Sequence, residues 1–297
     1  MTDTTSTTTA AIAIEADSRV DAAIEFCASQ DYPLGVALIA HRWRSEPADA
    51  VVTALATFQN ADGGFGNGLE VDIAAPQSNP FATRLAMQAL LALDSLPPTA
   101  TPVLAGIDRY LAAAQDDGGD FRFSPEVLAG EIAPWFAGWT YPNLNPSACL
   151  AGLAARLGTG NEQLFVRLGN MIDAIGSVET ARTGEFYDVL PYAEGAYLLD
   201  ANGREDLVVA TAEGITERMR NGGFEDASHA LDLALGGGDT LSTRIPADLI
   251  ASEAASLLAA QQEDGGWPSP YTAAWRSWTT ATAFVYLATL RDMSRED

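Results

Sequence analysis

Acidic residues in two places of the sequence could transfer a proton. Glu70 and Asp72 stand in a glycine-rich loop, and Asp188 follows Tyr187 and precedes Glu194. A carboxyl group buried beside a second one has a raised pKa and can act as a general acid. Asp72, Glu70 and Asp188 are therefore candidate catalytic residues. The alternatives are that Glu70 and Asp72 are solvated loop acids and that Asp188 is a helix N-cap.

Aromatic residues crowd two other stretches. One contains Trp135, Phe136, Trp139 and Tyr141, and the other contains Tyr271, Trp275 and Trp278. Aromatic faces stabilise cations, including carbocations, and they stack on sugar rings. We expect a substrate-binding surface formed by Trp135, Trp139, Tyr141, Tyr187, Trp275 and Trp278. The alternative is that both loops are hydrophobic lids over the end of a helical barrel.

One turn motif occurs twice in the sequence, and it indicates which helices position these residues. It reads Gln59-x-x-Asp62-Gly63-Gly64-Phe65 and again Gln261-x-x-Asp264-Gly265-Gly266-Trp267. Paired glycines can adopt φ > 0 and end a helix, and the Asp can cap the next backbone turn. The pattern predicts helices over 51–60 and 80–93 around the first copy, and over 249–262 and 279–290 around the second.

Weaker copies lie between these two. They are Asp117-Gly118-Gly119-Asp120-Phe121, with Gln115 one place nearer the Asp than in the strict pattern, Asn221-Gly222-Gly223-Phe224, and the barely recognisable Gly184-Glu185-Phe186. With an atypical first pair of helices they give about six helix hairpins. Six hairpins in a closed ring leave no terminal repeat uncovered. We therefore predict an all-α fold, an (α/α)6 toroid with a central cavity, over 17–297 as one domain.

The two strict turns resemble the repeat of the class II terpene cyclases of the squalene–hopene type, and they are similar to that of protein prenyltransferase β-subunits. The stretch 77–93 also resembles the helix after the turn in those cyclases. The chain is similar as well to small bacterial proteins that carry the repeat, a likeness that implies no activity. The resemblance implies inner and outer helix rings, with a cavity mouth formed by 66–79, 121–145, 185–191, 225–229 and 268–278.

The sequence departs from both enzyme families at the site. It lacks the Asp-x-Asp-Asp motif with which a class II cyclase protonates its substrate. It also lacks the Asp-x-Cys cluster of the prenyltransferase zinc site, and its histidines are His41 and His229 alone. Zinc sites need a set of such ligands at suitable spacing. We expect no metal and no cofactor.

Charge and composition limit the partners. The 297 residues include 40 acids and 16 bases, a net charge of −24, and every base is Arg. Such a field repels nucleic acid and anionic lipid, and the lack of Lys excludes Schiff-base chemistry and a P-loop. Prolines interrupt the apolar run 132–155, so no membrane span is expected. We predict a mobile tail over 1–16, no secretory signal and a cytoplasmic protein.

Three functions stay open at this stage. The first is a class II terpene cyclase-like enzyme that performs acid-initiated cyclisation or isomerisation of an apolar isoprenoid-type substrate. The second is a non-catalytic helical toroid that binds a small molecule or a protein. The third is a carbohydrate-active toroid that uses paired carboxylates. The small apolar molecule of the first reading is the partner we expect, and the sequence does not indicate an oligomeric state.

Overall fold

The described part of the chain is helical. The computed structural model describes residues 4–269 and 271–296, and these form 17 α-helices, two 3-10 helices and no β-strand. The first half contains α1 (Thr4–Asp17), α2 (Val20–Ser29), α3 (Pro33–Arg44), α4 (Ala48–Ala56), α5 (Pro80–Leu91), η1 (Pro98–Ala100), α6 (Thr101–Ala114), α7 (Pro125–Leu128) and α8 (Pro134–Ala137). The second half contains α9 (Leu144–Leu157), α10 (Glu162–Ile175), α11 (Val178–Thr183), α12 (Phe186–Ala201), α13 (Glu205–Arg220), α14 (Ala227–Gly236), α15 (Asp239–Ser242), α16 (Ala247–Ala259), η2 (Ala273–Trp275) and α17 (Arg276–Glu296). The prediction of an all-α protein is confirmed.

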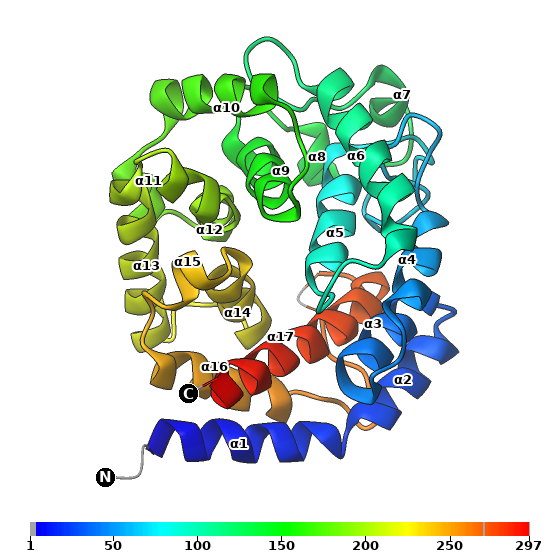
Figure 1. Ribbon diagram of the computed structural model, residues 1–297, viewed down its shortest axis with the longest axis vertical. Coiled ribbons are helices and arrows are strands. Elements are labelled where there is room, and N and C mark those ends of the chain that lie inside the picture. Colours follow the sequence, from blue (N-terminus) through cyan, green and yellow to red (C-terminus); the bar gives the residue numbers. More distant parts are fainter. Residues whose placement is uncertain (1–3, 270, 297) are drawn as a thin grey trace.

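The middle helices pack against one another in the order in which they occur in the sequence. α5 packs against α9, α9 against α12, α12 against α14, and α14 against α17. α17 in turn packs against α2 and α3, which brings the last long helix back beside the first ones. Figure 1 shows α5, α9, α12, α14 and α17 toward the middle of the view, with α4, α6, α10, α13 and α16 outside them.

The two groups of helices differ in how much of their surface they bury. α10 buries one stripe, formed by Leu164, Leu168, Met171 and Ile172, as expected for a helix with one solvated face. α9 and α12 are buried on almost every side. Gly152 lets these two approach closely, since a Cβ there would lie 2.3 Å from the Glu194 carbonyl oxygen. This contact places the Glu194 side chain inside the fold.

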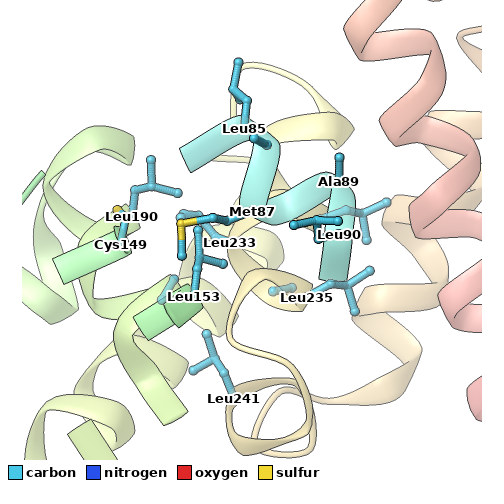
Figure 2. Close-up of a cluster of buried hydrophobic side chains, with 14 of the residues drawn as sticks. Leu85, Met87, Ala89, Leu90, Cys149, Leu153, Leu190, Leu233, Leu235 and Leu241 are labelled. Carbon is cyan, nitrogen blue, oxygen red and sulfur yellow. The ribbon is translucent and has the colours of Figure 1, made fainter. Parts of the chain in front are cut away.

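A continuous apolar core joins the middle helices. Figure 2 shows part of it, with side chains from α5, α9, α12 and α14, among them Met87, Cys149, Leu190 and Leu233. All four are buried. A smaller cluster, with Phe81 at its centre, lies between the start of α5 and the loops that carry α7 and α8.

The strict Gly-Gly turns fasten one outer helix to the next. Gln59 Nε2 donates to the Gly63 carbonyl oxygen (2.9 Å) and to that of Val103 in α6 (3.0 Å). Gly63 has φ +95°, and a Cβ there would lie 2.0 Å from the Gly106 carbonyl oxygen. The glycine is thus required both by its left-handed backbone and by the close approach of α6.

The last strict turn makes the same docking onto the start of the chain. Gly265 has φ +85°, and a Cβ there would lie 2.2 Å from the carbonyl oxygen of Ala22 in α2. Trp267 is buried and meets Phe284 edge to face with ring centroids 5.3 Å apart. The turn after α16 therefore attaches to α2.

The second copy has a different register from the one its sequence indicates. Gln115 Nε2 donates to the carbonyl oxygens of Gly119 (3.3 Å) and Leu164 in α10 (3.2 Å), so Gln115 occupies the place of Gln59. Gly119, with φ +97°, takes the place of Gly63. The glycine pair is thus displaced by one residue relative to Gln115, and Asp116 rather than Asp117 caps the turn, accepting from the Gly118 amide at 2.9 Å.

The N-terminal segment differs from the predicted tail. Residues from Thr4 onward form α1, which packs against α16 and α17. Ile12 and Ala16 are buried. In place of a mobile tail over 1–16 the structure has a helix whose last turns share the core, while residues 1–3 lie outside the described part. Across that part, no helix combines the length and apolarity needed to cross a bilayer.

We expect Gly63→Ala to lower the free energy of unfolding by more than about 2 kcal/mol, because it combines a strained left-handed backbone with a clash against α6. Chemical denaturation measures the loss. Gly68→Ala is the matched control, since Gly68 has φ +79° but no atom within 4 Å of its Cβ position. Equal losses in the two variants would mean that docking onto α6 adds nothing.

Candidate functional site

A cavity of about 430 Å³ opens among α5, α8, α12, α14, η2 and α17 and the loop that follows the first Gly-Gly turn. Seven of the nine candidate catalytic and substrate-binding residues line it, namely Glu70, Asp72, Trp135, Trp139, Tyr187, Trp275 and Trp278. They come from four separate stretches of the chain. The structure therefore brings together Glu70, Asp72 and most of the aromatic residues that the sequence pattern placed at one cavity mouth.

Glu70 is a buried acid in this cavity. Its side chain accepts a hydrogen bond from the Asp72 amide (3.2 Å), and only 5% of the residue is exposed. Burial raises the pKa of Glu70 to about 8; the Asp72 amide and Arg84 oppose the rise, and the Asp72 charge adds to it. At neutral pH the Glu70 carboxyl group therefore holds a proton and can donate it.

Asp72 is held in place from two sides. Its Oδ2 accepts a hydrogen bond from Trp275 Nε1 (2.8 Å). Its backbone carbonyl accepts from the Ala133 amide (2.8 Å), next to the helix that carries Trp135. Burial raises the pKa of Asp72, and the hydrogen bond from Trp275 opposes that rise. Asp72 thus links the acidic loop to both aromatic stretches.

The aromatic wall combines packing with exposure. Trp139 meets Phe81 edge to face with ring centroids 5.1 Å apart, and Phe136 packs against both. Trp135, in contrast, is 50% exposed. The hydrophobic-lid interpretation fits Phe136, which is buried in the small cluster around Phe81. Trp135 makes a cavity wall that a ligand could cover.

Two residues predicted for the site lie elsewhere. Tyr141 does not line the cavity: its hydroxyl accepts from the Phe123 amide (3.1 Å), and the Arg122 guanidinium lies 4.8 Å from its ring centre. Asp188 is exposed in the first turn of α12 and is also absent from the cavity lining. Consecutive helical residues point about 100° apart, so Tyr187 faces the cavity while Asp188 does not.

A second polar group in the cavity was not predicted. His229 Nε2 lies 2.6 Å from the Tyr271 hydroxyl, which also accepts a hydrogen bond from the Tyr187 hydroxyl. His229 Nδ1 lies 3.3 Å from Asp226 Oδ1. The sequence places 225–229 at the mouth, but it shows His229 only as an isolated possible zinc ligand. Its partner Tyr271 is 42 residues away.

Charges around His229 favour its protonated form. Burial alone would lower the pKa of His229, but Asp226, Asp232 and Glu225 together raise it above its ordinary value. Burial correspondingly disfavours the Asp226 carboxylate, yet the hydrogen bonds and charge from His229 lower the pKa of Asp226 overall. When His229 is protonated, the two residues form a charge pair at the start of α14.

The floor of the cavity is a buried ionic network. Arg84 Nε and its Nη2 donate to the two carboxylate oxygens of Glu194 at 2.7 and 2.6 Å, and Glu194 is fully buried. Gln88 donates to Glu194 as well (2.6 Å), and Tyr286 donates to Asp232 (2.9 Å). Arg84 is therefore already paired and is not free to neutralise Glu70.

A second cavity of about 210 Å³ lies beyond this floor. It shares Gln88, Asp232, Trp278, Thr282 and Tyr286 with the first cavity. These shared side chains separate the two spaces. Among the side chains described, no three of His, Cys, Asp or Glu are grouped so as to hold a metal ion.

Glu70→Gln should become progressively more stable than the wild type as pH rises. Between its ordinary pKa of 4.5 and about 8, Glu70 keeps its proton in the folded state and loses it in the unfolded state. The folded protein therefore loses about 1.4 kcal/mol of stability per pH unit over that range, and the Gln variant does not. Urea titrations across the range measure the difference. The exposed Asp188→Asn control should parallel the wild type, and a parallel Glu70→Gln curve would show that Glu70 is not a buried neutral acid.

Comparisons with known proteins assign the chain to no family. No protein-family model matches the chain, and no curated protein or solved structure is significantly similar to it. The chemistry of the cavity is therefore argued from its own side chains.

Proposed function

We propose that the protein is an enzyme that performs acid-initiated isomerisation or cyclisation of a small apolar, isoprenoid-type molecule in the cavity. The observation that carries the proposal is Glu70, a buried carboxylic acid with a pKa of about 8 at the edge of an aromatic cavity. A volume of about 430 Å³ suits a small molecule. A cytoplasmic location belongs to the same proposal.

In this proposal Glu70 gives its proton to a carbon–carbon double bond. The π electrons form the new C–H bond, and the neighbouring carbon becomes a cation. The faces of Trp135, Trp275 and Trp278 stabilise that positive charge, as aromatic rings do for cations. Asp72, held by the Trp275 indole, adds a fixed negative charge nearby. The cation then rearranges or attacks a second double bond within the same molecule.

We further propose that the helices form the (α/α)6 toroid expected from the repeat. Two features support it: the contact of α17 with α2 and α3, and the docking of the last Gly-Gly turn onto α2. In such a ring the cavity lies at one end, where the segments after successive turns meet. The recruited acid would then be Glu70 rather than a residue of an Asp-x-Asp-Asp motif.

The positions of Glu70 and Asp72 do not match the pair of carboxyl groups that glycoside hydrolysis needs. Glycosidases place two carboxyl groups on either side of the bond that breaks. Glu70 and Asp72 come instead from one loop, and Glu70 accepts a hydrogen bond from the amide of Asp72 itself. Both groups thus belong to the same wall of the cavity. A lack of turnover would instead indicate a non-catalytic binding protein.

Glu70→Gln should reduce product formation at least about 100-fold, because general acid catalysis contributes that much or more and the amide cannot supply the proton. Myrcene and farnesol incubated with the purified chain in D2O serve as probes, and mass spectrometry of the extracted products detects deuterium in new C–H bonds. Asp188→Asn is the matched control, with an exposed carboxylate outside the cavity. Wild-type turnover in Glu70→Gln, or no turnover by the wild type, contradicts the proposal.

A further inference from the structure

We propose that Tyr271, backed by His229 and Asp226, removes the proton that ends the reaction, so that the product is an alkene isomer of the substrate. This inference rests on the proposed function. It assigns a base to the reaction, a role that neither the sequence motifs nor the acidic loop supplies.

The geometry of the four groups forms a directed chain. His229 Nδ1 lies 3.3 Å from Asp226 Oδ1 without hydrogen-bond geometry, and this nearby negative charge favours the neutral tautomer with its proton on Nδ1. Nε2 is then an acceptor, and the Tyr271 hydroxyl donates to it over 2.6 Å. The Tyr187 hydroxyl donates to Tyr271 in turn. This arrangement leaves one lone pair of the Tyr271 oxygen free for a substrate proton.

Tyr271 lines the same cavity as Glu70 and lies beside the acidic wall. Its ring centre is 6.2 Å from that of Trp275, whose indole donates to Asp72. His229 is fixed from behind by Phe186, with ring centres 4.4 Å apart. A substrate cation between these walls would have a proton donor on one side and a phenol oxygen on another.

The proposed step balances within the protein. A C–H bond next to the cationic carbon breaks, and its electron pair becomes the new π bond. The proton goes to the Tyr271 oxygen, and the phenolic proton of Tyr271 passes to His229 Nε2. The resulting imidazolium is paired with Asp226. Solvent then carries this proton back to Glu70, so no oxidant, reductant or co-reactant is consumed.

The charges around His229 define a pH window. Glu225, Asp226 and Asp232 face it, and the uncharged Tyr271 and Phe186 complete its surroundings. Below its pKa His229 is already protonated and cannot take the proton from Tyr271. Above about pH 8 Glu70 has lost the proton it must donate. Alkene formation should therefore decline at low pH, where His229 becomes protonated, and again above about pH 8, where Glu70 loses its proton.

The experiment uses the full chain with myrcene and farnesol in D2O and compares alkene with alcohol products. Tyr271→Phe is compared with the wild type at equal probe consumption, so that only the distribution of products enters the comparison. The alkene share should fall at least about fivefold, because water captures the cation that no base deprotonates. In His229→Gln, the alkene share should no longer fall at low pH. Tyr197→Phe is the matched control, an exposed tyrosine outside both cavities.

The outcomes separate the two proposals. An unchanged alkene share in Tyr271→Phe, with Glu70→Gln inactive, overturns the role of Tyr271 and leaves the acid in place. An acid-side decline that persists in His229→Gln overturns the relay to His229. Full turnover in Glu70→Gln, or a wild type that leaves both probes unchanged, overturns the proposed function and the role of Tyr271 with it.

Discussion

The pairing of Arg84 with Glu194 is the interaction on which the chemistry of this cavity depends. The contact is bidentate and buried, and Gln88 completes the hydrogen bonds to Glu194. Such a pair is retained only when its geometry satisfies both charges. Because the guanidinium is committed there, Glu70 forms no ion pair among the described residues. A buried carboxyl group without a counter-ion keeps its proton.

The scaffold explains why these groups meet. The first Gly-Gly turn, which follows α4, makes backbone contact with α6 at Gly63 and Gly106, and the loop after the turn carries Glu70 and Asp72 back over the start of α5. Gly152 lets α9 approach α12 closely, which places Glu194 opposite Arg84. Close backbone contacts made possible by glycine thus determine both the position of Glu70 and the pairing of Arg84 with Glu194.

Much of this arrangement follows from sequence patterns and part of it does not. The repeated turns predict the helices and indicate that their following loops meet, which is why the acids and four tryptophans could be placed together. The register at Gln115 was missed because Asp116 and Asp117 are both plausible caps until the hydrogen bonds are known. Asp188 does not line the cavity because its side chain points about 100° away from that of Tyr187 around α12.

Contacts between residues far apart in the chain could not be predicted from the sequence either. Tyr271 and His229 come from different segments, and neither segment alone indicates that the phenol meets the imidazole. The same holds for Arg84 and Glu194, 110 residues apart. Local patterns specify turns, caps and helix faces, whereas such contacts depend on how the helices pack against one another.

The central claim is that Glu70 is a neutral acid at physiological pH. Infrared difference spectroscopy of the wild type against Glu70→Gln observes the carbonyl stretch of a protonated carboxyl group directly. We predict that this band is present at about pH 6, is lost as pH rises through about 8, and is absent in the variant at every pH. A difference spectrum that shows an ionised carboxylate at about pH 6 would contradict the account.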